Sequence, residues 1–380
     1  MKITKKTAGK KFAAAVTAAA LAAVLAAGAI TASGSDDSSS RTIAGTGSHG
    51  AADGAAAQFN LPAGVFGGAG GVIYVVDTYN NLIRRIDAGG SVSTVTGAIA
   101  ATGEFNFPRG FHRDGAAGDA LFSRPASGVL CPEGSMYIAD SANHSIRVIT
   151  GGNVYTLAGG TAGHADGSVA EARFNRPSAI ARGSCGSLYI ADALNHAIRR
   201  IDPNGNVTTV AGTPGVSGYA DGTGGAAQFN GPMGIAVSPD GTVFVADTGN
   251  HLIRAIEDGR VRTLAGTLVF PADMSPDWHD DFYIDDAPLG GFADGANGAM
   301  FNLPAGLALR GETLIVADSA NHRIRAVSPD GRVTTLAGTG EPGYSANAFH
   351  TPRGVYIRGN ELIIADSGNN MIRALPISGS

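Results

Sequence analysis

The phrase D-x-x-N-[HN]-x-I-R occurs six times in this chain of 380 residues, with no gap in any copy. The copies read DTYNNLIR, DSANHSIR, DALNHAIR, DTGNHLIR, DSANHRIR and DSGNNMIR, and successive copies begin 48 to 71 residues apart. A repeat of this length is typical of solenoids, propellers and other arrays, in which each copy is one supersecondary unit. Most of the chain therefore has to fold as six similar units.

Short β-rich runs surround each copy of the phrase. A run such as YIAD leads into it, a run such as IRVI leaves it, and a segment of the form P-x-[GA]-[VIL] precedes both. After the first five copies comes a fourth run such as TLAG. Short β-branched runs separated by Gly and Pro predict antiparallel strands, here named a to d within each unit. No helical period lies between them, which excludes parallel βαβ units.

Four-stranded units repeated radially predict an all-β fold, a six-bladed β-propeller with four antiparallel strands per blade. The sixth unit lacks its TLAG-like run, and a matching run, RTIAGTG, stands at 41–47 instead. We therefore expect residues 41–46 to supply strand d of the last blade. Such closure removes the free sheet edges of an open array.

These motifs together resemble the NHL repeat, over about residues 41–380. WD repeats need a tryptophan in each blade, whereas this chain has only Trp278, outside the phrase. NHL domains are in general interaction modules, so the resemblance implies binding of a partner. Some six-bladed NHL-like propellers are lyases, and related folds include calcium-dependent lactone hydrolases, so the resemblance also implies an enzymatic alternative.

The first residues do not fit the repeat. Five lysines are followed by a 19-residue apolar run and a polar stretch of small residues, which predicts a secretory signal peptide. The expected domains are a signal peptide at 1–32, a polar linker at 33–40 and the propeller at 41–380. We expect export to the periplasm or outside the cell, with membrane attachment only if the signal segment stays uncleaved.

The charge balance argues against nucleic acid as a partner. The net charge is −5, and the five lysines of the signal segment are the only lysines in the chain. Without that segment the charge is about −10, whereas nucleic-acid binders need basic faces.

The Asp and Arg of the phrase are predicted to be structural, because six equal copies around a ring cannot form one asymmetric site. In a b–c hairpin, Arg147 lies opposite Ile138 and shares a sheet face with Asp140, so an Asp–Arg contact is expected in each blade. The Asn at the fourth position is expected to be left-handed. The twelve residues are Asp77, Arg84, Asp140, Arg147, Asp192, Arg199, Asp247, Arg254, Asp318, Arg325, Asp366 and Arg373.

The fifth position of the phrase is histidine in four copies and asparagine in the other two. These histidines are candidates for ligand binding, and the alternative is a capping hydrogen bond in the turn. One shared metal ion is disfavoured because equivalent loops of different blades stand far apart. The four are His144, His196, His251 and His322.

The d–a and b–c loops emerge on one face of an a-b-c-d meander, and we expect function there. The loop at 267–295 is the longest and mixes aromatic with acidic residues, which suits a recognition surface. Its binding candidates are Trp278, His279, Phe282 and Tyr283, and its weaker calcium candidates are Asp277, Asp280 and Asp281.

The favoured function is a non-enzymatic binding propeller for a protein, peptide or glycan. The sequence contains none of the common catalytic motifs, which favours binding over catalysis. Whether the protein is an enzyme is left open. The alternative is a metal-dependent lyase or hydrolase at the channel mouth. No cofactor is predicted, and calcium or zinc belongs to that alternative, whose acid–base candidates are His112, His164, His279 and His350.

Two cysteines, Cys131 and Cys185, fall near the a–b turns of the second and third units. In an exported protein such a pair is a candidate disulfide, provided that the two turns approach closely enough.

Overall fold

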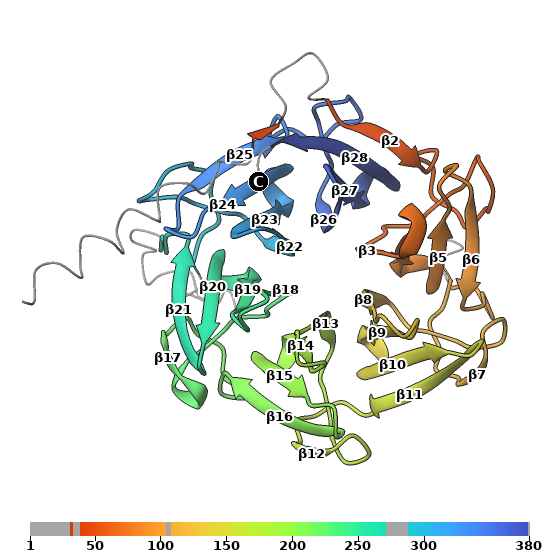
Figure 1. Cartoon of the computed structure of the whole chain (residues 1–380), viewed down its shortest axis with the longest axis horizontal. Helices are drawn as coiled ribbons and strands as arrows, with labels where there is room; N and C mark the ends of the chain where they lie inside the picture. Colours follow the sequence, from red (N-terminus) through yellow and green to blue (C-terminus); the bar gives the residue numbers. More distant parts are fainter. Residues whose placement is uncertain (1–30, 33–38, 104–107, 271–287, 379–380) are drawn as a thin grey trace, which may run out of the picture.

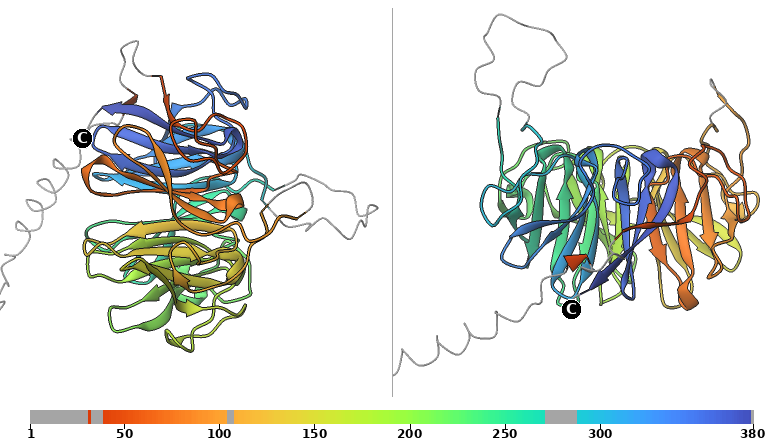
Figure 2. Two further views of the ribbon diagram at one scale, coloured as in Figure 1. Left: turned by 90° about the vertical axis from the view of Figure 1, so that its right-hand side faces the viewer. Right: turned by 90° about the horizontal axis from the view of Figure 1, so that it is seen from above.

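The computed structural model is a ring of six antiparallel sheets around a central channel (Figure 1). It describes residues 31–32, 39–103, 108–270 and 288–378. Seen from the side, the blades form a thick disc with their strands running between its two faces (Figure 2). The six-bladed, all-β propeller expected from the repeat is confirmed.

Each of the first five blades contains a four-stranded meander in which strand a lines the channel and strand d lies on the outer side (Figure 1). The strands of the first three are β3 (Gly64–Gly67), β4 (Ile73–Asp77), β5 (Leu82–Ile86) and β6 (Val92–Thr96); β8 (Pro125–Leu130), β9 (Met136–Asp140), β10 (Ser145–Thr150) and β11 (Asn153–Gly159); and β13 (Pro177–Arg182), β14 (Leu188–Asp192), β15 (Ala197–Ile201) and β16 (Asn206–Ala211).

The fourth and fifth blades repeat this plan. Their strands are β18 (Gly234–Val237), β19 (Val243–Asp247), β20 (Leu252–Glu257) and β21 (Arg260–Ala265), then β22 (Pro304–Arg310), β23 (Thr313–Asp318), β24 (Arg323–Val327) and β25 (Val333–Ala337). Short strands of the d–a loops add a fifth strand beside strand d in blades two to four: β7 (Gly115–Ala116), β12 (Gly167–Ser168) and β17 (Gly222–Thr223).

The last blade joins the two ends of the described chain. It holds β26 (Pro352–Arg358), β27 (Glu361–Asp366) and β28 (Met371–Ser378), and β2 (Arg41–Ala44) pairs antiparallel with β28 as its strand d (Figure 1). The two-residue β1 (Thr31–Ala32) also pairs with β28. Ring closure by the N-terminal strand is thus as expected, while the predicted signal peptide falls mostly outside the described residues.

Between strands b and c, every blade has a single turn of 3-10 helix formed by the second to fourth residues of the repeated phrase. These turns are η3 (Thr78–Asn80), η5 (Ser141–Asn143), η6 (Ala193–Asn195), η8 (Thr248–Asn250), η9 (Ser319–Asn321) and η10 (Ser367–Asn369). Two further 3-10 turns, η2 (Ala69–Gly71) and η7 (Gly224–Ala226), lie in loops.

The core consists of six apolar clusters, each between two neighbouring blades. In one of them Phe122 packs with Phe66 and Ile83 of the first blade and with Ile138 of the second. The phenylalanine of each F-x-x-P motif is buried in this way, and each joins two blades: Phe59, Phe122, Phe174, Phe229, Phe301 and Phe349.

The candidate disulfide between Cys131 and Cys185 is not formed, because both cysteines are free. The Cys131 side chain is buried, whereas Cys185 is exposed and its Sγ lies 3.2 Å from Ser187 Oγ. The two thiols therefore occupy different environments instead of meeting between the turns. Within the described part of the chain, no helix is long and apolar enough to cross a membrane.

Candidate ligand-binding site at the channel mouth

The repeated Asp and Arg form a buried ion pair in every blade. In the second blade Asp140 Oδ2 accepts hydrogen bonds from Arg147 at 2.7 Å and Asn143 at 2.8 Å, and Oδ1 accepts one from the Ser123 backbone N–H. Both side chains of this pair are fully buried. The corresponding Arg–Asp distances in all six blades lie between 2.6 and 3.2 Å.

Each of these arginines also bonds to the d–a loop. Arg147 reaches a second carboxylate, Asp114, at 2.6 Å, and Asp114 accepts the N–H and hydroxyl of Thr156 on strand d. The guanidinium lies over the Phe122 ring, 4.9 Å from its centroid. In five blades the arginine has an equivalent second carboxylate. In the sixth blade, Arg373 donates to a backbone carbonyl instead.

Burial raises the pKa of four of the repeated aspartates to about 6, although the neighbouring arginine and the hydrogen-bond donors act in the opposite direction. These are Asp77, Asp140, Asp192 and Asp247. None of these aspartates is among the residues that line the channel cavity, and their bonds hold the loops to the blades.

One detail of the turn differs from the prediction. The left-handed residue is the fifth of the phrase and not the fourth: His144 has φ 54°, while Asn143 stays within the 3-10 turn. The reason is that the Asn143 amide is needed to bond Asp140 and the Phe111 carbonyl, which fixes it inside the turn. The residue after it then takes the left-handed conformation that ends the turn.

The fifth position also joins neighbouring blades. His144 Nδ1 accepts the backbone N–H of Arg176, which precedes the first strand of the next blade, at 3.2 Å. Where the position is asparagine, the side-chain oxygen takes the same role, as Asn81 Oδ1 does for Arg124 N–H at 2.7 Å. We call this contact the inter-blade latch, and its six acceptors are Asn81, His144, His196, His251, His322 and Asn370.

In the latch Nδ1 accepts a hydrogen bond, so the imidazole has to be neutral with Nδ1 unprotonated. This tautomer is assigned from the hydrogen-bond network. Burial lowers the pKa of all four latch histidines, in agreement with this requirement. These residues, considered in the sequence as ligand-binding candidates, lie here in the turn and point to the next blade.

The described acid–base candidates of the enzymatic alternative are not among the residues that line the channel cavity. His112 Nε2 and His164 Nε2 lie 2.9 and 3.0 Å from threonine hydroxyls of strand d, Thr156 and Thr209. His350 packs edge-on against His322. His279 lies outside the described residues. Across the residues that the structure describes, no three His, Cys, Asp or Glu side chains are grouped to hold a metal ion.

The long loop between the fourth and fifth blades is described only at its ends. Phe270 is exposed and packs against Tyr219 with 5.6 Å between ring centroids, and the exposed Phe292 ring lies 3.8 Å below the Arg323 guanidinium. The predicted binding and calcium candidates in this loop lie outside the described residues: Trp278, His279, Phe282, Tyr283, Asp277, Asp280 and Asp281.

The channel itself contains a cavity of about 670 Å³, which lies within the usual range for small-ligand sites. It opens on the face that carries the b–c turns, since Tyr79, Ser141 and Leu194 of those turns line it. Its wall is mostly Ala, Gly, Val, Leu and Ile from the six a strands. No Asp or Glu is found among the described residues of this wall.

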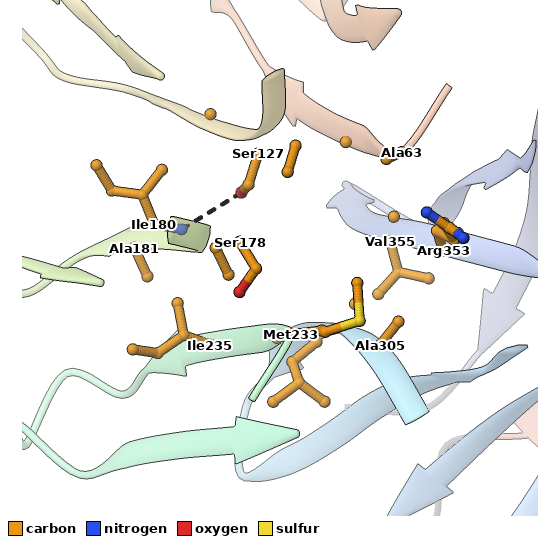
Figure 3. Close-up of a pocket in the computed structure, with 18 of the residues that line it drawn as sticks. Ala63, Ser127, Ser178, Ile180, Ala181, Met233, Ile235, Ala305, Arg353 and Val355 are labelled. Carbon is orange, nitrogen blue, oxygen red and sulfur yellow. Dashed lines mark hydrogen bonds between the residues drawn. The ribbon is translucent and has the colours of Figure 1, made fainter. Parts of the chain in front are cut away.

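The residue after the proline of each F-x-x-P motif forms a ring at the mouth of this cavity. Four members are small, whereas the other two are Met233 and Arg353 (Figure 3). Figure 3 shows these two side chains on neighbouring sides of the opening, with Ala305 between them. We call this set the mouth ring: Ala63, Ala126, Ser178, Met233, Ala305 and Arg353.

Two more arginines stand at the mouth, each directly before a motif proline. Arg124 and Arg176 are exposed and line the cavity. Arg124 is held over Tyr79, with its Nη1 3.0 Å from the hydroxyl and its guanidinium 4.4 Å from the ring centroid. A further arginine, Arg182, lines the cavity at the far end of β13. The site is therefore apolar below and cationic at its rim.

The mouth residues were not predicted from the sequence. An alignment of the six copies on Phe and Pro does distinguish them, because the position after Pro is Ala, Ala, Ser, Met, Ala and Arg. At that position, unlike at the Asp and Arg of the phrase, the copies differ in size and charge.

Comparison with known proteins agrees with this architecture. The sequence model of the NHL repeat matches residues 229–256 and 301–333. NHL repeat-containing protein 2 of Bos taurus is 32% identical over 172 residues, which cover 41% of this chain and 23% of that protein. The chain spans less than a quarter of the length of the curated relatives that it matches.

Solved structures share the fold. An auxiliary nutrient binding protein from Bacteroides thetaiotaomicron VPI-5482 superposes with a TM-score of 0.62 at 16% identity, covering 92% of this chain and 77% of that chain. XC5397 from Xanthomonas campestris, a gluconolactonase, superposes with a TM-score of 0.56 at 16% identity, covering 95% and 93%. At such identities the likeness extends to the fold alone.

Proposed function

Because the chain folds as a six-bladed β-propeller built from NHL repeats, we propose that it is a non-enzymatic binding protein whose ligand enters the channel mouth. The ligand is a peptide, a protein segment or a glycan. With the signal peptide expected at residues 1–32, the protein works in the periplasm or outside the cell.

The observation that carries this proposal is the cavity of about 670 Å³ behind an asymmetric mouth ring. A pocket with apolar walls and a few polar groups at its rim is the usual form of a ligand site. The repeated polar residues bond to each other and to backbone, as the latch and the Asp–Arg pairs illustrate. At the mouth ring, by contrast, equivalent positions of the six blades differ in size and charge.

Binding is preferred over catalysis because of what lines the cavity. Its described wall contains no histidine, cysteine or carboxylate. Of the histidines considered for acid–base chemistry, the three described ones contact threonine hydroxyls or another histidine: His112, His164 and His350. The fold likeness to a gluconolactonase and to a nutrient binding protein favours neither function by itself.

The test is a comparison of two tryptophan variants on peptide and glycan arrays. Ala126→Trp places a large side chain in the mouth ring, where Ala126 is only partly buried. Asn204→Trp is the control, because Asn204 lies exposed in the turn between β15 and β16 on the opposite face. Far-UV circular dichroism and a thermal melt verify that both variants fold.

We expect ligands bound by the wild-type protein to be retained by Asn204→Trp and lost by Ala126→Trp. Retention of every ligand by a folded Ala126→Trp protein would remove the channel mouth as the binding site.

A further inference from the structure

The rim of the cavity has one sign of charge. Arg124, Arg176 and Arg353 are exposed and line the mouth, from the second, third and sixth blades. The protein as a whole is acidic, with a net charge of −5. A rim that carries three arginines and, among its described residues, no acid attracts negative charge even in a protein that is acidic as a whole.

Two of these arginines differ in their bonding from the arginines of the repeated phrase. Among the described residues, the guanidinium groups of Arg176 and Arg353 make no hydrogen bond or ion pair, in contrast to the repeat arginines, such as Arg147, which bond two carboxylates. Arg124 is held by Tyr79. Guanidinium groups that are free at the edge of an apolar cavity are able to bind a carboxylate through two parallel hydrogen bonds.

The cavity below the rim determines which chemical group accompanies the charge of the ligand. Val65, Ile180, Ile235 and Val355 line its wall, and Met233 stands at the mouth beside Arg353 with Ala305 between them (Figure 3). Methionine is flexible and polarisable, so it adapts to aromatic and aliphatic groups. An apolar group placed here is removed from water while a charge attached to it stays at the rim.

We propose that the channel mouth binds an amphiphilic carboxylate, with the carboxylate on Arg353 and the apolar body in the cavity beside Met233. This inference rests on the proposed function and specifies the chemical class of its ligand. The same chemistry is offered by a free apolar acid and by the C-terminus of a peptide that ends in an apolar residue. Arg176, in the opposite part of the rim, adds long-range attraction for the carboxylate.

The experiment measures binding by isothermal titration calorimetry with three acids and their uncharged partners. The acids are octanoate, 3-phenylpropionate and the tripeptide Ala-Ala-Phe; the partners are octanol, 3-phenylpropanol and the amidated tripeptide. Binding of the acids alone supports the proposal. Preference for the small acids identifies a free acid as the ligand, and preference for the tripeptide identifies a chain end.

Two substitutions at the mouth test the assigned roles. Arg353→Gln is expected to weaken acid binding by about ten-fold or more, the effect of one lost hydrogen bond to a charged group. Met233→Ala is expected to weaken binding severalfold through the loss of apolar contact. Arg262→Gln is the matched control, since Arg262 is exposed on β21 and pairs with Glu257 outside the cavity.

The proposal is overturned if none of the acids binds at a ligand concentration of about 10 mM, which would fill most of a site with a millimolar Kd. It is also overturned if an acid and its uncharged partner bind equally tightly, or if Arg353→Gln and Arg262→Gln bind the acids with the same affinity. These results are distinct from failure of the proposed function. Array ligands that Ala126→Trp loses but Arg353→Gln retains would keep the channel mouth as a binding site and reject the carboxylate.

Discussion

The inter-blade latch makes stability depend on pH through four histidines and not through the two asparagines at the same position. The perturbation is a quadruple substitution of His144, His196, His251 and His322 by asparagine, the residue that the protein itself uses in the first and last blades. Asn81 and Asn370 accept the next blade's N–H at 2.7 and 2.9 Å, so asparagine fits the latch.

The sign follows from the direction of the pKa shifts. Burial lowers the pKa of each latch histidine below its ordinary value of 6.5, so the folded state binds fewer protons than the unfolded state near that pH. The stabilisation by the neutral histidines is therefore complete above about pH 6.5 and is lost as the pH falls through 6.5 toward the folded-state pKa values. Protonated Nδ1 donates and cannot accept the backbone N–H.

The expected magnitude comes from counting hydrogen bonds. A net hydrogen bond contributes about 1 kcal/mol, and latches in different blades add because they share no partners. Lowering the pH from 7.5 to 5.0 should cost the wild-type protein about 4 kcal/mol more unfolding free energy than it costs the quadruple variant.

Urea unfolding at both pH values, followed by circular dichroism, measures this difference. The buried aspartates act in the opposite direction, because their raised pKa values near 6 make the folded state bind protons first. Both proteins contain them, so their effect cancels in the comparison. Equal loss of stability in the two proteins would refute the role assigned to the histidines.

Three further predictions concern the buried ion pairs, the cysteines and the closure of the ring. Asp247→Asn removes the buried one of the two carboxylates that pair with Arg254 and leaves only the partly exposed Asp221, so it is expected to lower the unfolding free energy by about 3–5 kcal/mol; a urea-unfolding loss below about 1 kcal/mol would contradict the buried pair. In the native protein iodoacetamide should alkylate the exposed Cys185 well before the buried Cys131, whose pKa burial raises to about 11, and mass spectrometry of a non-reduced digest that found the two peptides linked would reverse the assignment. Removal of residues 41–47 takes β2 from β28 and should abolish the cooperative melt or cause dimerisation through the open edge, whereas an unchanged melting temperature and elution volume would show that closure contributes little.

The fold was predictable from the sequence because its determinants are local and repeated. The Asp140–Arg147 pair follows from the register of one hairpin, and the pairing of β2 with β28 follows from a strand missing at one end of the chain and present at the other. Each of these inferences needs only a short segment and the alternation of side chains in a strand.

The contacts that the sequence did not indicate join segments that are distant along the chain. The latch from His144 reaches Arg176, and Arg147 reaches back to Asp114, so neither follows from the geometry of a single hairpin. The mouth ring is formed by one residue from each blade, and its members meet only after the ring closes. A repeated motif indicates only the positions that its copies share, whereas Arg353 and Met233 lie at a position where the copies differ.

The most direct test of ligand binding at the channel mouth is a crystal structure of the protein grown with saturating Ala-Ala-Phe. We expect electron density for the C-terminal residue inside the cavity, with its carboxylate bonded to Arg353 and its ring beside Met233. An empty cavity, or peptide density on another surface of the propeller, would contradict it.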